Sequence, residues 1–292
     1  MNNSVENEPK LAYALGFGSV MVLGLPLNAV SLWILLRRHS LKSPNAIFMV
    51  NLAISDLLLA ISLPTRVYLY ATGTWPLSSK ECVWITMLFR NNIRSSSIFI
   101  TFISVDRLLA VVYPLRSRHL RTASNAWKSV ALVWLFVIVV NIPEGLAFAR
   151  NNSNESTCFE FRLQQQPRSP LSYLQLVLVV TLLAVNLVST ALVFRTLHRR
   201  LSDSAKVNNK VNVMLIFAMN LVMFTICFLP VSVGLLTIQK HKLTPLVFLA
   251  SVNCCLDPLL YYFSLDAFWK KKEDVDLARQ QETRDNLFHE MA

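Results

Sequence analysis

Seven long stretches of mostly apolar residues limit the folds that this chain can adopt. A helix needs about 20 such residues to cross the hydrocarbon core of a bilayer. The stretches cover residues 11–36, 46–71, 82–113, 129–149, 171–195, 211–239 and 243–265. Composition agrees, because 54% of the residues are hydrophobic and only 15% are charged, against about 25% in soluble domains. The sequence therefore predicts an all-α membrane protein, a bundle of seven transmembrane helices over residues 11–265.

Basic residues predict the orientation of this bundle. The net charge of +11 does not gather on one dense face of the kind that binds nucleic acid, so no nucleic-acid partner is expected. The basic residues instead follow the first, third, fifth and seventh stretches: Arg37, Arg38, Lys42, Arg116, Arg118, Arg121, Arg199, Arg200, Lys206, Lys210 and Lys270 to Lys272. The positive-inside rule makes this side cytosolic.

The predicted orientation gives the two ends of the chain different locations. We expect an extracellular tail over residues 1–10, and a cytosolic tail over residues 266–292 that has room for a short amphipathic helix. The protein is expected to be a multi-pass protein of the plasma membrane, surrounded by membrane lipids.

Two kinds of residue support an extracellular side. Glycosylation sequons at Asn2, Asn151 and Asn154 all fall in segments assigned to that side. Cys82 begins the third stretch at its outer end, and Cys158 lies in the connector after the fourth. An oxidising compartment favours a disulfide between these two cysteines. The alternative is a pair of free thiols.

Charged residues inside the apolar stretches indicate functional sites, because each costs about 2.5–3.5 kcal/mol to insert at the centre of a membrane helix. Arg90 and Arg94 are four residues apart and share one helix face, about 12 and 18 Å in from Cys82. Glu144 offers one negative charge for this pair, so one interpretation is a buried salt bridge between Arg90 and Glu144.

A single carboxylate cannot neutralise Arg90, Arg94 and Arg66 together, which leaves positive charge for a ligand. Guanidinium groups match the geometry of phosphate or carboxylate. Tyr68 and many aliphatic residues predict apolar walls that suit an acyl or aromatic body.

Several short motifs carry a resemblance to a known family. They are the run from Gly24 to Asn28, the run from Asn51 to Asp56, the run SVDRLLAVVYPL from Ser104 to Leu115, Trp134, and two later segments, Cys227 to Pro230 and Asp257 to Tyr261. Each stands on its own stretch and in order. The chain resembles the rhodopsin-like G-protein-coupled receptors over residues 11 to 272, and within them the branch of nucleotide and lysophosphatidic acid receptors.

The resemblance implies roles for the intramembrane residues. It implies that Arg107 contacts a heterotrimeric G protein and that Asp106 pairs with Arg107 or with a nearby loop group. It also implies a sodium pocket, with Asp56 as metal ligand beside Ser96, Asn253 and Asp257, and with Tyr261 in the same activation network. The alternative for Asp56 is a protonated carboxyl group hydrogen-bonded to its neighbours. No other cofactor is expected.

The sixth and seventh stretches have two further features. Pro230 removes a helix hydrogen bond and predicts a kink, and Phe228 stands where the family usually has Trp, either as a switch at the pocket floor or as core filling. Only 31 residues separate Pro230 from Tyr261, so either the seventh span is short at its outer end or the chain is an abbreviated form.

The predicted function is a receptor that transmits the binding of an anionic ligand to a G protein. A lysophospholipid such as lysophosphatidic acid is the first candidate, and a nucleotide or a small carboxylic or hydroxy acid is the second. A transporter or channel is the alternative of another class, although no inverted repeat or charged ring supports it. An enzyme is not expected, because the sequence shows no paired nucleophile and base and no phosphate-binding glycine loop.

Overall fold

The computed structural model describes residues 10–38, 41, 43–150, 158, 170–199, 207–237 and 243–262. The helices α1 (Leu11–Arg38), α2 (Pro44–Thr72), α3 (Ser79–Val112), α4 (Ala123–Arg150) and α5 (Pro170–Arg199) are continuous. The sixth span comprises α6 (Val207–Val222), a π-helical segment η3 (Met223–Phe228) and α7 (Leu229–Thr237). The seventh comprises α8 (Leu243–Ser251) and helical residues 253–262. The described residues thus contain seven helices long and apolar enough to cross a membrane, which confirms the predicted fold.

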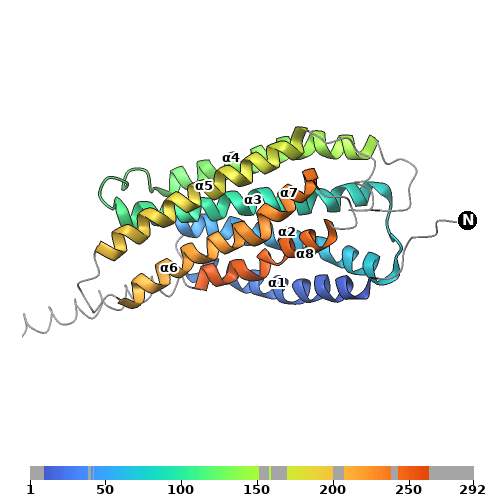
Figure 1. Cartoon of the computed structure of the whole chain (residues 1–292), viewed down its shortest axis with the longest axis horizontal. Helices are drawn as coiled ribbons and strands as arrows, with labels where there is room; N and C mark the ends of the chain where they lie inside the picture. The colour runs from blue at the N-terminus through green and yellow to red at the C-terminus, as the bar shows by residue number, and fades with distance from the viewer. Residues whose placement is uncertain are drawn as a thin grey trace, which may run out of the picture.

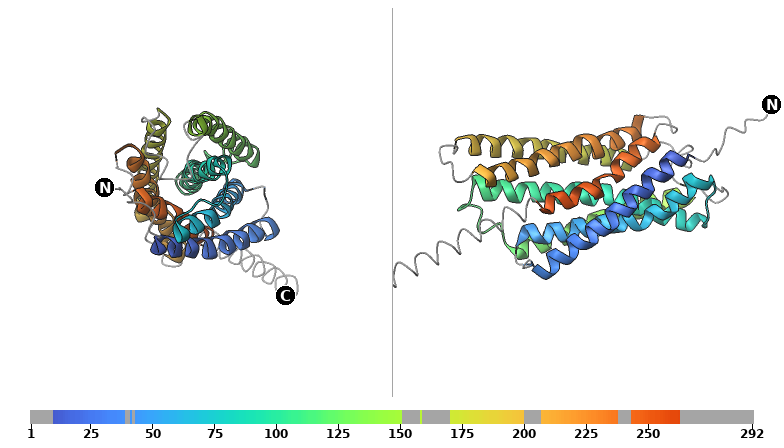
Figure 2. Two further views of the ribbon diagram at one scale, coloured as in Figure 1. Left: turned by 90° about the vertical axis from the view of Figure 1, so that its right-hand side faces the viewer. Right: turned by 90° about the horizontal axis from the view of Figure 1, so that it is seen from below.

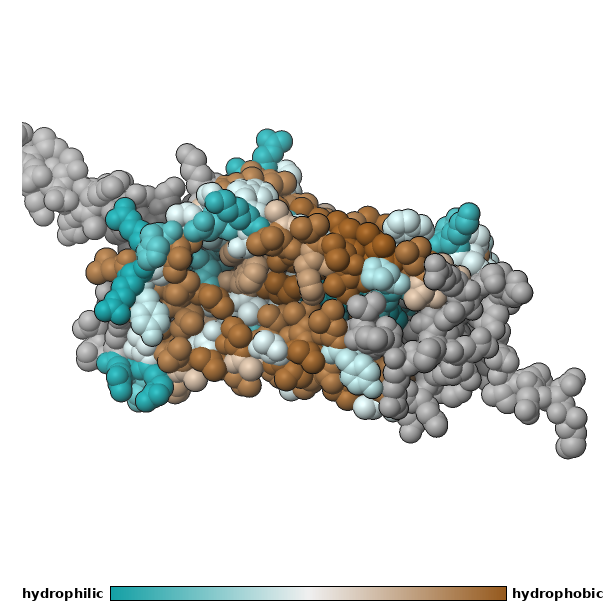
Figure 3. Space-filling view, turned by 90° about the horizontal axis from the view of Figure 1, so that it is seen from above, coloured by the Kyte–Doolittle hydropathy of each residue, from teal (hydrophilic) through white to brown (hydrophobic). Residues whose placement is uncertain are grey.

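The helices form one elongated bundle with α3 in its interior (Figures 1 and 2). Helix α3 contacts α2, α4, α5 and α6, and α1 covers α2. On the face seen in Figure 3, hydrophobic residues cover the middle of the bundle, and hydrophilic residues gather toward both ends. Large apolar side chains are also exposed on the helices, such as Leu132 of α4 at 66% and Val177 of α5 at 62%. Many exposed apolar side chains are unfavourable in water but are stable against lipid.

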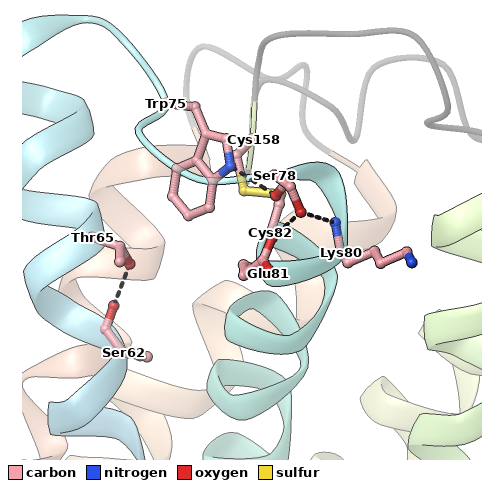
Figure 4. The surroundings of a disulfide bond; sticks show 8 residues. All are labelled: Ser62, Thr65, Trp75, Ser78, Lys80, Glu81, Cys82 and Cys158. Carbon is pink, nitrogen blue, oxygen red and sulfur yellow. Dashed lines mark hydrogen bonds between the residues drawn. A yellow bond between two sulfur atoms is a disulfide. The ribbon is translucent and has the colours of Figure 1, made fainter.

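One end of the bundle carries a disulfide. Cys82 and Cys158 are bonded with their Cα atoms 5.8 Å apart, which confirms the predicted pair (Figure 4). Helix α2 ends nearby at Thr72, because Gly73 adopts a left-handed φ of 72°. Helix α3 begins after Ser78, whose hydroxyl accepts a hydrogen bond from the backbone N–H of Lys80. This end is called the disulfide end below, and the opposite end is called the Arg107 end.

The sixth span accommodates Pro230 by widening the helix. Proline lacks a backbone N–H, and its ring collides with the carbonyl four residues earlier in a regular α-helix. Immediately before Pro230, the six residues of η3 follow π-helical geometry, and the N–H of Leu229 donates to the carbonyl of Phe224. One extra residue per turn creates a local defect, and such defects are frequent at functional sites. The predicted kink site is therefore a π-helical segment.

The seventh span packs closely on α1 where a second proline, Pro258, leaves a backbone carbonyl free. Pro258 has no N–H to donate to the carbonyl of Cys254. That carbonyl accepts a hydrogen bond of 2.6 Å from Nδ2 of Asn28. The helices approach so closely that a Cβ on Gly24 would lie 2.8 Å from Sγ of Cys254. A larger residue at position 24 would therefore force the side chain of Cys254 to shift.

Among the described residues, the seventh span is the shortest. It contains 20 residues, against 25 to 34 in the other six. This agrees with a short seventh span, one of the two explanations for the short link to the sixth span. The sequons at Asn2, Asn151 and Asn154 and the tail over residues 266–292 lie outside the described residues.

Candidate functional site

Arg94 is the centre of a polar network inside the bundle. Its side chain is only 3% exposed, and each nitrogen of its guanidinium group has a partner. Nε donates to Oε1 of Gln175 at 2.9 Å, Nη1 donates to Oδ1 of Asn141, and Nη2 donates to Oε2 of Glu144 at 2.7 Å. Arg94 therefore connects α3 to both α4 and α5.

Glu144 pairs with two arginines at once. Its Oε2 contacts Arg94, and its Oε1 forms a salt bridge with Nη1 of Arg90. The predicted pairing of Arg90 with Glu144 is present, and Arg94 shares the same carboxylate. One negative charge faces two positive charges, so these three side chains carry a net charge of +1 in a place that water barely reaches.

A small cavity lies against this network. Its volume is about 10 Å³, and it is lined by Arg90, Ile93, Arg94, Glu144, Gln175 and Leu235. That is roughly the volume that one water molecule requires. Leu235 comes from α7, seven residues after η3 ends. The wall of the cavity is thus part of the segment that follows the π-helical defect.

The other predicted ligand residues lie away from this cavity. The side chain of Arg66 is 1% exposed and lies over two aromatic rings, with its Cζ 4.9 Å from the ring centre of Phe89 and 5.7 Å from that of Phe17. These contacts are cation–π interactions, which partly compensate burial of the charge. Tyr68 is 46% exposed. Two residues along a helix amount to a rotation of about 200°, so Tyr68 cannot share the inward face of Arg66. Their roles in binding stay predictions.

A second polar cluster surrounds Asp56. Nδ2 of Asn92 donates to Oδ1 of Asp56 at 2.9 Å and to Oγ of Ser96 at 3.0 Å. The hydroxyl of Ser96 donates to the same Asp56 oxygen at 3.4 Å. Asp257 and Asn253 on the seventh span are both fully buried. The sequence therefore identified Asp56 and Ser96 but not Asn92 or Ser55, whose hydroxyl accepts a hydrogen bond from Nδ2 of Asn92 at 3.2 Å.

The donor set of this cluster fits a sodium ion. Within the described part of the chain, Oδ2 of Asp56, both carboxylate oxygens of Asp257 and Oδ1 of Asn253 are buried and receive no hydrogen bond from an N–H or hydroxyl donor. The carboxyl groups of Asp56 and Asp257 lie within hydrogen-bonding reach of each other, so two acidic groups share one buried site. Carboxylate, amide and hydroxyl oxygens are the ligands that a hard cation prefers. Buried oxygens without partners are costly, and a cation between them offsets that cost.

At the Arg107 end, Asp106 forms its ion pair with Arg121 and not with its sequence neighbour Arg107. The carboxylate of Asp106 accepts hydrogen bonds from Nε and Nη2 of Arg121 at 2.8 and 3.1 Å. Of the two predicted partners for Asp106, the structure selects the loop group. Nε of Arg107 is buried and has no hydrogen-bond partner among the described residues. Arg107 is therefore not held by its neighbour.

Phe228 and Tyr261 lie in the core between the two ends. Phe228 is fully buried, and its ring meets that of Phe224 edge-on with centroids 5.4 Å apart. Tyr261 is 1% exposed. Phe228 is not among the residues that line the cavity. Its position fits packing in the core, and a switch role stays a prediction.

Three amide side chains in these networks were not singled out from the sequence. Asn141 stands three residues before Glu144, so helical spacing alone places both on one face of α4. Asn92 is four residues before Ser96, which gives the same kind of signal on α3. Gln175 gives no such signal, because its contact with Arg94 depends on how α5 is rotated against α3.

Comparison with known proteins gives a consistent result. The family described as 7 transmembrane receptor (rhodopsin family) matches residues 27–261. The chain is 33% identical over 293 residues to lysophosphatidic acid receptor 4 of Homo sapiens, covering 92% of this chain and 79% of that receptor. It is 36% identical over 278 residues to lysophosphatidic acid receptor 5 of Bos taurus, with 86% and 75% covered.

A purinoceptor is also similar. The chain is 32% identical over 275 residues to a purinoceptor of Rattus norvegicus, with 87% of this chain and 76% of that protein covered. Together with the seven apolar helices, these matches identify a multi-pass protein of the plasma membrane. The chain belongs to the rhodopsin family of seven-transmembrane, G-protein-coupled receptors.

Proposed function

We propose that this receptor binds an anionic lysophospholipid, with lysophosphatidic acid as the first candidate, and transmits binding to a heterotrimeric G protein. The observation that carries the proposal is the buried net positive charge of Arg90, Arg94 and Glu144 beside a cavity between α3, α4, α5 and α7. A buried excess charge is costly unless an opposite charge meets it. An anionic headgroup supplies that charge.

The cavity wall links the proposed headgroup site to the rest of the sixth span. A phosphate group is larger than the one water that the cavity admits, so binding requires a wall to move. Leu235 lines the cavity and lies on α7, which comes after η3 in the chain and contains Pro230. Displacement of α7 at this defect offers a route by which binding changes the position of α6.

The relatives support the same ligand class. Several are named lysophosphatidic acid receptors, and one is named a purinoceptor. The name lysophosphatidic acid receptor points to a ligand that carries phosphate, which matches the geometry of guanidinium groups. On this proposal the protein acts as a receptor and not as an enzyme. A small carboxylic or hydroxy acid remains the competing ligand for the same arginines.

A chain-length series tests the proposed ligand. Membranes that contain the receptor and a G protein are titrated with lysophosphatidic acids of increasing acyl length, with ATP, and with lactate, and GTP exchange is measured. Each buried CH₂ contributes about 0.8 kcal/mol, so potency should rise steeply with acyl length. A response to ATP or lactate at lower concentration than to any lysophosphatidic acid would contradict the proposal. Neutral monoacylglycerols of the same lengths control for membrane partitioning.

We also propose that a sodium ion occupies the cluster of Asp56, Ser96, Asn253 and Asp257. The buried oxygens in that cluster that receive no hydrogen bond from an N–H or hydroxyl donor support it. An ion that binds only the folded state stabilises it, by about 2.7 kcal/mol when its concentration is 100 times the dissociation constant. We expect the melting temperature of the purified receptor to be higher in NaCl than in choline chloride, and Asp56→Asn to remove the difference. An equal difference in the variant would argue against the site.

A further inference from the structure

Glu144 holds the two arginines in the way that an anionic ligand would. Each oxygen of its carboxylate contacts a different guanidinium group, Oε1 with Arg90 and Oε2 with Arg94. A phosphate or carboxylate ligand would use the same donors, because its oxygens have similar spacing and charge. The side chain is 7% exposed, so its charge is not screened by bulk water.

The cavity leaves no room for an anion beside Glu144. Its volume of about 10 Å³ admits roughly one water molecule. A ligand phosphate has three terminal oxygens, which need more space than one water molecule. Its negative charge and that of the buried Glu144 carboxylate would also repel each other. A ligand anion that contacts both arginines therefore needs the Leu235 wall to move, and charge repulsion favours a position of Glu144 away from the two guanidinium groups.

Two of the three hydrogen-bond partners of Arg94 are residues other than Glu144. Asn141 and Gln175 both accept hydrogen bonds from Arg94, and both are neutral. The site also contains a donor that Glu144 does not use. Nε2 of Gln175 is buried without a hydrogen-bond partner among the described residues, and Gln175 lines the cavity. An anion in the place of Glu144 can accept from that donor as well.

We propose that Glu144 is an internal counterion that the ligand displaces, so that this carboxylate competes with every anion for Arg90 and Arg94. The inference rests on the proposed anionic ligand and adds how the site selects it. A phosphate monoester carries more charge and more acceptor oxygens than a carboxylate, so it replaces Glu144 more readily. The competition thereby favours phosphate over carboxylate ligands.

Removal of the competing charge tests this proposal. Binding of 1-oleoyl lysophosphatidic acid is measured on the wild type, on Glu144→Gln and on Glu81→Gln. Glu81 is an exposed residue near the disulfide end, so its variant loses the same charge away from the cavity. We expect at least tenfold tighter binding by E144Q and unchanged binding by E81Q. Neutral 1-oleoyl glycerol should bind the wild type and E144Q equally.

In E144Q, Arg90 and Arg94 lie inside the bundle without a carboxylate, so this variant can fold poorly. A second pair of variants, R90Q and R90Q/E144Q, avoids that problem. Arg90→Gln leaves Arg94 and Glu144 as a neutral pair, so it should bind 1-oleoyl lysophosphatidic acid at least tenfold more weakly than the wild type. The double variant R90Q/E144Q restores a net charge of +1 and keeps Arg94 bonded to Asn141 and Gln175. It should recover at least tenfold over R90Q, a coupling that a double-mutant cycle isolates.

The outcomes separate this inference from the proposed function. One outcome overturns the inference alone: the wild type binds the probe, but E144Q binds it no more tightly than the wild type does. The same conclusion follows if R90Q/E144Q binds it no more tightly than R90Q does. Glu144 is then a structural partner. Failure of both the wild type and E144Q to bind the probe overturns the inference together with the proposed ligand. Tighter binding by the variants that lack the carboxylate supports both.

Discussion

Arg94→Ala should weaken the binding of lysophosphatidic acid at least tenfold while the amount of receptor at the cell surface stays near that of the wild type. A hydrogen bond to a charged group contributes about 1.5–3 kcal/mol, and each 1.4 kcal/mol is a factor of ten in affinity. Loss of one such contact to a headgroup therefore removes between tenfold and a hundredfold of the affinity.

The network explains why the protein should survive this change. Glu144 keeps its salt bridge with Arg90 when Arg94 is removed, so no carboxylate is left buried without a partner. Asn141 and Gln175 lose a donor, which costs about 1–3 kcal/mol for each unsatisfied polar group unless water fills the space. Surface labelling and saturation binding on the same cells measure abundance and affinity separately.

Two further substitutions sharpen the Arg94 experiment. Arg94→Lys keeps the charge but cannot hold Asn141, Glu144 and Gln175 with one planar fork, so it should fall between the wild type and R94A. Lys80→Ala removes an exposed basic residue from the first turn of the same helix and should leave affinity unchanged. Collapse of surface expression with unchanged affinity in the remaining receptor would instead make Arg94 structural.

The helices were predictable because bilayer thickness imposes a length that hydropathy measures directly. The residues at which the helices begin and end were less predictable. The fourth span was predicted from residue 129, and the helix begins at Ala123. Polar residues such as Asn125 and Lys128 lower the hydropathy of its first turns. The backbone N–H of Asn125 instead finds the hydroxyl of Thr122, which caps the helix start.

The networks were only partly predictable for a related reason. Charges inside apolar stretches identified Arg90, Arg94 and Glu144, because burial makes each of them costly alone. Which arginine meets Glu144 depends on the rotation of α4 against α3, and sequence spacing does not give that angle. The same limit applies to Pro230. The sequence shows that a hydrogen bond must be lost, but a kink and a π-helical segment both satisfy that requirement.

Arg107→Ala should abolish ligand-stimulated GTP exchange and leave ligand affinity within twofold of the wild type. Arg107 lies 13 residues from Arg94 along α3, which corresponds to about 20 Å, so its loss cannot reach the headgroup site directly. Asp106 is engaged with Arg121, and the buried Nε of Arg107 has no hydrogen-bond partner within the described residues. The guanidinium group is thus not committed to the neighbouring carboxylate of Asp106.

The surroundings of Arg107 give the reason for a large effect. Three residues of α3 next to Arg107 pack with residues of α5 and α6, so movement of α6 changes the contacts next to Arg107. The cluster comprises Leu108, Val111 and Val112 of α3, Val193 and Leu197 of α5, and Phe217 of α6.

Arg118→Ala removes an exposed arginine from the turn after α3 and is the matched control, expected to exchange GTP normally. Arg107→Lys should retain part of the activity if charge alone matters. Exchange at the wild-type rate by R107A would show that the G protein is contacted elsewhere, because R107A removes the guanidinium group while the pair between Asp106 and Arg121 stays intact.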